Sequence, residues 1–248
     1  MIHPAVKSLF KYHWLTRPTP SGGIEYNSYA VDAINQTRGY FSDPVTFNDP
    51  FDCSLDSVVP DHYDHPDNAA LAKVLTDSVT RWIELNVRRY GIFSLTENSK
   101  DMLMWSHYAG QHTGICIEYE RHSNNVLGDV SVTRPVRYTD AYPLLSYKET
   151  AHLQYQSASL DDSALSSYIY TKSSCWSYER EWRAIRLTDP SERMLELDHV
   201  RVRSIIFGVR TRDEHKQWLC ETLQDKTITF KKTVKGKQNF ELVIQNDA

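Results

Sequence analysis

The sequence lacks the features that mark several common classes of protein. Its four cysteines are scattered along the chain, so no C-x-x-C pair is present for zinc or redox chemistry. No apolar run reaches the length of a membrane helix, and the first residues hold no apolar run long enough for a secretory signal. We therefore expect a cytoplasmic protein whose cysteines are mostly small buried hydrophobic residues.

The chain also lacks the short motifs that identify familiar nucleotide-binding and hydrolytic sites. It has no G-x-S-x-G elbow, no Walker loop, no G-x-G-x-x-G and no H-E-x-x-H. The pairs His62/His65 and His107/His112 come without a convincing third ligand, so no metal site is predicted. The basic stretch over residues 231–237 is interpreted as the solvated tip of a hairpin rather than as a phosphate-binding site.

The composition is that of a folded chain with little excess charge. A net charge of −4 excludes a domain held to nucleic acid by bulk charge alone. Hydrophobic residues make up 40% and aromatic residues 12%, which suits a thick core or a surface that stacks on a flat ligand. No linker separates two domains cleanly, so we predict one domain over residues 1–248, within which residues 200–248 could form a β-α-β-β subunit.

Short strands and irregularly placed helices follow one another along the chain, and this order predicts an α+β fold rather than a repeating βαβ fold. Apolar periodicity, caps and turn residues predict helices over residues 25–36, 68–89, 99–108, 160–172 and 212–224. Strands are expected over residues 9–15, 92–95, 114–119, 130–138, 182–187, 202–207, 228–231 and 240–245.

The sharpest local pattern is WSYEREWR over residues 176–183. If this segment is extended, its period of two places Glu179, Glu181 and Arg183 on one face. Two carboxylates that lie so close interact, so the pKa of one should be raised while the neighbouring arginine lowers the pKa of the other. The alternative is a structural one, in which the Glu–Arg pair holds the edge of a strand and Trp182 belongs to the core.

A second pattern lies over residues 91–108, where a strand passes through a polar turn into a helix. Its hydroxyls and backbone N–H groups could face a polar ligand. Met104, Trp105 and Tyr108 fall within contact distance of one another on that helix. The alternative is that this apolar stripe faces the core.

Two further segments could contribute polar groups to a site. His13 lies on the first predicted strand, where an exposed edge histidine is the alternative interpretation. The FNDPF segment carries Asn48 and Asp49, which either rim a pocket or bond their own backbone in a turn.

Five blocks of the sequence, taken in order, resemble one bacterial family. They lie within residues 9–210 and read FSDPVTFNDPFDCS, SLTENSKDMLMWSHYAGQHTGICIEY, VRYTD, WSYEREWRAI and SIIFGVR. In these blocks the chain is similar to the domain-of-unknown-function family numbered twenty-nine seventy-one. That resemblance implies a shared fold and no particular activity.

A second resemblance points to a function. The stretch GIFSLTENSKDMLMWSHYA is similar to the nicotinamide-side block of ADP-ribosyltransferases, which in the poly-ADP-ribose polymerases runs Gly-x-Tyr-Phe and then Ser-Lys-Ser-Ala-x-Tyr. The counterparts in this chain are Gly91, Phe93, Ser94, Ser99, Lys100 and Tyr108. Glu179 and Glu181 resemble the Glu-x-Glu of arginine-modifying transferases. His13 would match the His or Arg of their first strand, a role for which Lys11 and Tyr12 compete.

The resemblance implies an ADP-ribosyltransferase-like α+β fold with split mixed or antiparallel β-sheets and flanking helices, and NAD bound as a substrate between the sheets. It implies that Glu181 is the catalytic carboxylate and that Glu179 assists or orients the acceptor. The acceptor would be a macromolecule, either nucleic acid or protein, and no membrane is involved. The residues expected to bind NAD are Tyr12, His13, Asn48, Ser94, Trp105, Tyr108 and Arg183.

The proposed chemistry suits these residue types. Breaking the nicotinamide–ribose bond builds positive charge at the anomeric carbon, as glycoside hydrolysis does, and a nearby carboxylate stabilises that charge. Three alternatives stay open at this point. They are an NAD glycohydrolase that uses water as acceptor, a non-catalytic module that binds a nucleotide or a nucleic-acid end, and a nuclease whose carboxylates hold Mg²⁺.

Overall fold

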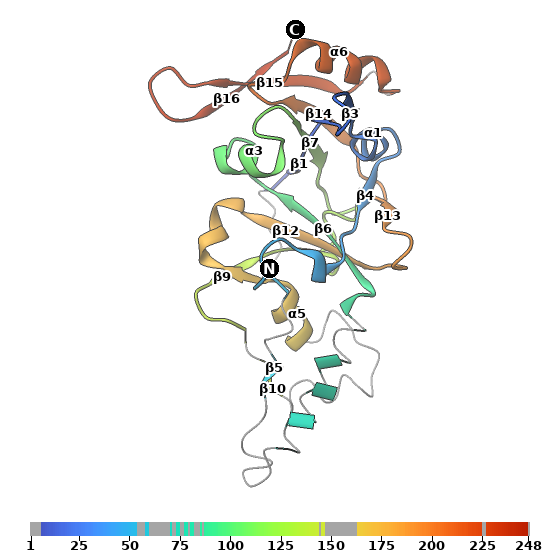
Figure 1. The fold of residues 1–248 in the computed structure, drawn as a ribbon, viewed down its shortest axis with the longest axis vertical. Coiled ribbons are helices and arrows are strands. Elements are labelled where there is room, and N and C mark those ends of the chain that lie inside the picture. Colours follow the sequence, from blue (N-terminus) through green and yellow to red (C-terminus); the bar gives the residue numbers. More distant parts are fainter. Residues whose placement is uncertain are drawn as a thin grey trace.

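A computed structural model of the chain describes residues 6–53, 58–59, 87–143, 145–146, 163–224 and 227–247, together with residues 70, 73–74, 77–78, 80–81 and 85. Within these residues the fold is α+β, with one large mixed sheet and few helices (Figure 1). In the described part of the chain, no helix is both long enough and apolar enough to cross a membrane.

The large sheet has eight strands in the order β16-β15-β14-β7-β1-β6-β12-β8. Strands β14 and β15 run parallel, and the other neighbouring pairs run antiparallel. The bounds are β1 Ser8–His13, β6 Tyr90–Thr96, β7 Ile115–Glu120, β8 Thr133–Pro135, β12 Glu181–Leu187, β14 Val202–Phe207, β15 Thr229–Lys235 and β16 Leu242–Asn246.

The sheet is nearly divided between β1 and β6. These two strands pair at one position, Phe10 with Thr96, whereas β1 pairs with β7 along its whole length and β6 pairs with β12 along its whole length. Near this junction the carbonyl of Ser94 accepts a hydrogen bond from the ammonium of Lys11, at 2.7 Å, in place of a backbone donor. The divergence of β1 from β6 leaves room for side chains between a five-stranded half and a three-stranded half.

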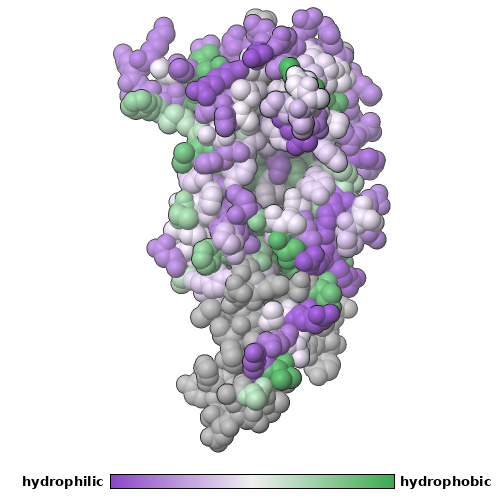
Figure 2. All heavy atoms as spheres, in the orientation of Figure 1, coloured by the Kyte–Doolittle hydropathy of each residue, from purple (hydrophilic) through white to green (hydrophobic). Residues whose placement is uncertain are grey.

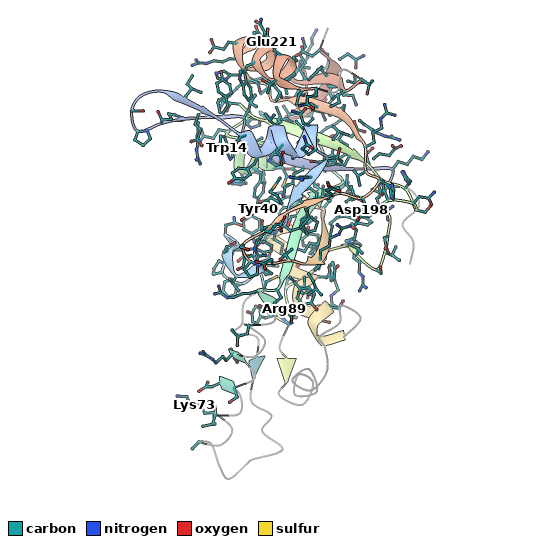
Figure 3. All side chains as sticks on the ribbon, turned by 90° about the vertical axis from the view of Figure 1, so that its right-hand side faces the viewer. Trp14, Tyr40, Lys73, Arg89, Asp198 and Glu221 are labelled. Carbon is teal, nitrogen blue, oxygen red and sulfur yellow. The ribbon has the colours of Figure 1, made fainter. Side chains whose placement is uncertain are left out.

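Among the residues that the structure describes, eight shorter strands and several helices connect the strands of the large sheet. The helices are α1 Ser28–Asn35, α3 Met102–Tyr108, α5 Ser163–Ile169 and α6 Asp213–Thr222, with 3₁₀ turns η1 Pro44–Thr46 and η4 Ser174–Glu179. The short strands are β2 Thr16–Pro18, β3 Ile24–Tyr26, β4 Arg38–Tyr40, β5 Val58–Val59, β9 Arg137–Thr139, β10 Leu145–Ser146, β11 Thr171–Ser173 and β13 Met194–Glu196. Figure 3 shows Glu221 of α6 at one end of the molecule, Lys73 at the other and Tyr40 of β4 between them.

The two faces of the sheet bury different cores. Cross-strand partners share a face, so the register places Tyr12, Cys116 and Ile206 on one side, and Trp105 of α3 packs there in contact with Tyr12 at 5.1 Å between ring centroids. The opposite face carries the larger core under α1 and α6, in which Leu9 is fully buried. Helix α3 therefore covers one face near the division of the sheet, where a site can form beside it (Figure 1).

Three predicted elements are corrected by the structure. The helix expected from residue 25 begins at Ser28, because β3 pairs with β2 as a hairpin and Asn27 then caps the helix by accepting from the N–H of Ala30. The helix expected over residues 160–172 ends at Ile169, and Thr171–Ser173 joins β9 as a parallel strand. The predicted strand over residues 130–138 is two short strands, β8 and β9. The cap expected near residue 68 lies outside the described residues.

Candidate functional site

A pocket opens where β1 diverges from β6. Both strands line it, through residues 10–12 and 94–96, and α3 contributes Met104 and Tyr108. The loop after η1 contributes Asn48 and Asp52, and the lower wall is formed by Lys172 of β11 with two glutamates from the Glu-x-Glu segment. The cavity volume is about 180 Å³, small for a whole cofactor and suited to one end of a larger ligand.

The wall of this pocket is a buried ion cluster. The ammonium of Lys172 lies 2.5 Å from Glu179 Oε2, 3.0 Å from Glu181 Oε2 and 3.5 Å from Asp52 Oδ2. Arg183 lies behind these groups, with its Nε 2.8 Å from Glu181 Oε1 and its NH2 2.6 Å from Asp52 Oδ2. Three carboxylates therefore share two cations in this cluster beside the cavity.

The two glutamates titrate in opposite directions, as their spacing predicts. Burial raises the pKa of Glu179, and Lys172 opposes this shift only in part. Burial would also raise the pKa of Glu181, but Arg183 and Lys172 outweigh it and hold that pKa below its usual range. Glu181 is therefore the carboxylate whose charge the fold fixes, and Glu179 is the one that can carry a proton.

The predicted strand geometry is wrong for Glu179. Residues 174–179 form a 3₁₀ helix, and Arg180 then takes a left-handed conformation at φ 43° before β12 begins at Glu181. Side-chain hydroxyls hold this turn, because Thr96 donates to the carbonyl of Glu179 at 2.6 Å and Tyr138 accepts from the N–H of Glu181 at 2.8 Å. The two carboxylates still meet, because both reach the same lysine.

Tyr108 and Ser94, which both belong to the second sequence pattern, line this pocket together. The hydroxyl of Tyr108 donates to Glu179 Oε1 at 2.7 Å, so this ring lines the pocket on the α3 side and restrains the Glu179 carboxylate. Ser94 lines the cavity next to Glu181 and helps to lower its pKa. Asn48 lines the pocket from an exposed position on its loop. Tyr12 also lines the pocket, and its hydroxyl donates to the carbonyl of Asn98 at 2.8 Å.

Three residues predicted to bind NAD are not part of the pocket lining. Trp105 is fully buried, donates its indole N–H to the carbonyl of Ser99 at 3.0 Å and belongs to the core. Arg183 is also fully buried and lies behind the lining, in contact with Glu181 and Asp52 and over the ring of Phe47. His13 lies two residues beyond Lys11 on β1, and burial followed by the nearby Lys11 charge lowers its pKa to about 3, so its ring is neutral.

Lys11 takes the place in the pocket that the sequence assigned first to His13. The strand period puts both on one face of β1 and both pair with β7, but of the two it is the side chain of Lys11 that crosses the division of the sheet to Ser94 and lines the pocket. Burial lowers the pKa of Lys11 to about 8, and Glu181 and Glu179 oppose a larger shift. Lys11 is therefore a cation that loses its charge just above neutral pH.

Neither Lys172 nor Asp52 was predicted from the sequence to belong to the site. Lys172 stands in a stretch predicted to be helical, and no local motif marks it; only the folded chain brings it to the acids. Asp52 belongs to the FNDPFD block that carries the family resemblance, and that block was the available signal. Among the described residues no group of His, Cys, Asp or Glu is arranged to hold a metal ion, and His62 and His65 lie outside those residues.

Fold and site together define an α+β protein with a divided mixed sheet and a buried ion cluster that lines a pocket at the division. Residues 104–184 match the model of a family described as "Protein of unknown function (DUF2971)". The match covers the MWSHYA, GICIEY and YEREWR blocks, so the resemblance to this family is confirmed there. The comparisons with curated proteins and with solved structures find no match.

Proposed function

We propose that this protein is an NAD-dependent ADP-ribosyltransferase with an ADP-ribosyltransferase-like arrangement of its divided sheet, acting on a macromolecular acceptor. The observation that carries the proposal is the lining of one pocket by all three sequence blocks of that resemblance. The first strand contributes Lys11, the strand-turn-helix block contributes Ser94 and Tyr108, and the third block contributes Glu179 and Glu181. These blocks are far apart in the sequence, and nothing in their local patterns requires them to meet.

In the proposed reaction the bond between nicotinamide and the anomeric carbon breaks, and nicotinamide leaves with the bonding electron pair. The anomeric carbon becomes cation-like, and a nucleophile of the acceptor bonds to it and gives up its proton. Glu181 supplies fixed negative charge beside that centre. Glu179, whose pKa is raised by burial, is placed to receive the acceptor's proton through its contact with the pocket.

The cavity is too small for the whole dinucleotide, so we place only the nicotinamide and its ribose inside. The ring of Tyr108 would stack against nicotinamide, and Ser94 would bond the ribose or the carboxamide. Lys11, rather than His13, would hold a ribose hydroxyl or the diphosphate. Asn48 would contact the part of NAD that leaves the pocket at its exposed edge.

The direct test is release of nicotinamide from NAD by the wild type and by Glu181→Gln, measured with protein and nucleic-acid acceptors present. We expect the substitution to lower the rate by about 10²–10³-fold, the usual effect of removing one preorganised electrostatic group. Glu192→Gln is the matched control, because Glu192 is exposed and lies outside the pocket lining. Equal rates for wild type and Glu181→Gln would refute the assignment. Release that needs no acceptor would favour an NAD glycohydrolase.

The charge of Lys11 gives a second, pH-dependent test. Because burial lowers the pKa of Lys11 to about 8, the KM for NAD is expected to be flat below that pH and to rise by about tenfold above it. Lys11→Met should raise KM and abolish this pH dependence. Lys7→Met, at an exposed position just before β1, should behave as wild type. A KM that stays flat from pH 7 to 10 in the wild type would remove Lys11 from NAD binding.

One observation favours a non-catalytic binding module as the second candidate. Both carboxylate oxygens of Glu181 already accept hydrogen bonds, from Arg183 and from Lys172. If these bonds persist with ligand bound, Glu181 stabilises the pocket rather than a reaction. Thermal stabilisation by NAD without nicotinamide release would support this candidate over the transferase.

A further inference from the structure

A second concave surface lies on the other side of α3 from the NAD pocket. It is a groove of about 530 Å³ between the start of α3 and the loop of the β15–β16 hairpin, which projects from the body of the molecule (Figure 1). The loop spans residues 236–241 and is closed by a hydrogen bond of 2.9 Å from the N–H of Gly236 to the carbonyl of Glu241. We call this surface the hairpin groove.

The hairpin groove combines positive charge with an exposed aromatic ring. Arg210, Lys235 and Lys237 line it and are exposed, and none of them forms an ion pair with any residue that the structure describes. Glu241 is the acidic residue of the lining. Phe240 is 98% exposed and also lines the groove, so its ring is available to a ligand. Figure 2 shows the projecting hairpin as mostly hydrophilic, with hydrophobic atoms exposed at its end.

The groove and the NAD pocket flank one helix on one face of the sheet. Leu242 lines the groove and packs in the same core cluster as Met104, which lines the NAD pocket. Met102 lines the groove from the first turn of α3, two residues before Met104. Since an α-helix rises about 1.5 Å per residue, a chain bound in the groove could reach the mouth of the pocket without crossing the sheet.

From this juxtaposition we propose that the hairpin groove binds single-stranded nucleic acid. The three unpaired cations would contact phosphates, and an unstacked base would lie on the ring of Phe240. An acidic peptide would satisfy the cations, but every unit of a single-stranded nucleic acid carries both a phosphate for the cations and a flat base for the aromatic face, which is why the nucleic acid is favoured. If the proposed transferase activity is correct, this groove also assigns the acceptor, and the acceptor is a nucleic acid.

Binding is tested with a fluorescent twelve-nucleotide oligothymidine by anisotropy, in the absence of NAD. Because three phosphates are contacted, the logarithm of the association constant should fall linearly with the logarithm of the salt concentration, with a slope of about −2. Phe240→Ala should weaken binding about tenfold, because it removes the ring on which a base stacks. The double variant Lys235→Gln/Lys237→Gln should weaken binding at low salt and bring the slope close to −0.7.

Matched controls use the same substitutions away from the groove. Tyr29→Ala removes another exposed aromatic side chain, 63% exposed on α1, and should leave the dissociation constant unchanged. Lys73→Gln removes an exposed lysine at the opposite end of the molecule (Figure 3) and should leave the salt slope unchanged. All these positions are on the surface, so thermal melting should match wild type and exclude misfolding as the cause of a loss.

Several results would overturn the proposal. These are no binding of the oligonucleotide by wild type, equal affinity of wild type and Phe240→Ala, or tighter binding of labelled polyglutamate at the same groove residues. The test is independent of catalysis. Oligonucleotide binding without nicotinamide release would contradict the transferase while supporting the groove, and nicotinamide release without oligonucleotide binding would do the reverse.

Discussion

Replacing Arg183 with methionine is expected to lower the free energy of unfolding by about 3–5 kcal/mol at neutral pH, the usual cost of removing one partner from a buried ion pair. The side chain is fully buried and contacts Asp52 and Glu181, so its loss leaves three carboxylates facing Lys172 alone. Urea denaturation of both proteins at pH 7 measures this change. Arg186→Met is the matched control on the same strand, because its ion pair with Asp198 is partly exposed and should contribute less than about 1 kcal/mol.

The destabilisation by Arg183→Met should depend on pH in a defined direction. Glu181 has a folded-state pKa lowered to about 2, against an unfolded value of about 4.3. Its ion pairing therefore contributes stability above the unfolded value, and this contribution is lost as the pH falls toward the folded value. The difference in unfolding free energy between wild type and Arg183→Met should therefore become smaller below about pH 4. Packing rather than charge would explain the effect if the difference in unfolding free energy between wild type and Arg183→Met stayed constant from pH 7 to pH 3. An equal loss of unfolding free energy in Arg186→Met would lead to the same conclusion.

Replacing Lys172 with methionine should cost a similar amount, about 3–5 kcal/mol, and should also change the chemistry of the pocket. Lys172 is the cation that bridges Glu179 and Glu181, and it is nearly buried. Without it, burial would raise the pKa of Glu179 further. The acidic limb of the pH profile for nicotinamide release should then move to higher pH, a change that loss of stability alone would not produce.

Rescue and control variants separate these effects. Glu179→Gln added to Lys172→Met removes one uncompensated charge, so it should restore part of the lost stability. For a carboxyl whose folded pKa is raised, stability is present below the unfolded pKa and is lost as the pH rises through the folded pKa, so Lys172→Met should be less stable relative to wild type above that folded pKa than below it. Lys232→Met, which breaks a partly exposed pair with Asp247, should leave the stability nearly unchanged because solvent screens that pair. If Lys172→Met/Glu179→Gln is no more stable than Lys172→Met, the conclusion that Lys172 bridges Glu179 and Glu181 is wrong.

Elements with strong local signals were predictable from the sequence. The apolar run of residues 202–207 is a strand with those bounds, and Asp101 caps α3 by accepting from the N–H groups of Leu103 and Met104. The spacing of Glu181 and Arg183 predicted their contact, because residues two apart on a strand share a face. Each of these features depends on neighbours within one turn or one strand.

The remaining features of the site depended on contacts between distant segments. Glu179 lies outside the expected strand because Arg180 has a left-handed backbone conformation, which residue type alone did not indicate. Trp105 fell on the core side of α3, and no local pattern distinguishes that side from the pocket side. Lys11 enters the pocket because β1 pairs with β6 at a single position, a property of sheet packing.

The sequence by itself determined which side chains carry charge, which segments are apolar, and where helices and strands are favoured, since these follow from residue type and short-range period. Tertiary structure alone decided which charges from distant segments became partners. Lys172 meets Asp52, and Arg183 meets the same aspartate, across more than a hundred residues of chain. The reason is physical: a buried carboxylate is stable only beside a cation, and the folded sheet, rather than sequence proximity, selects which cation that is.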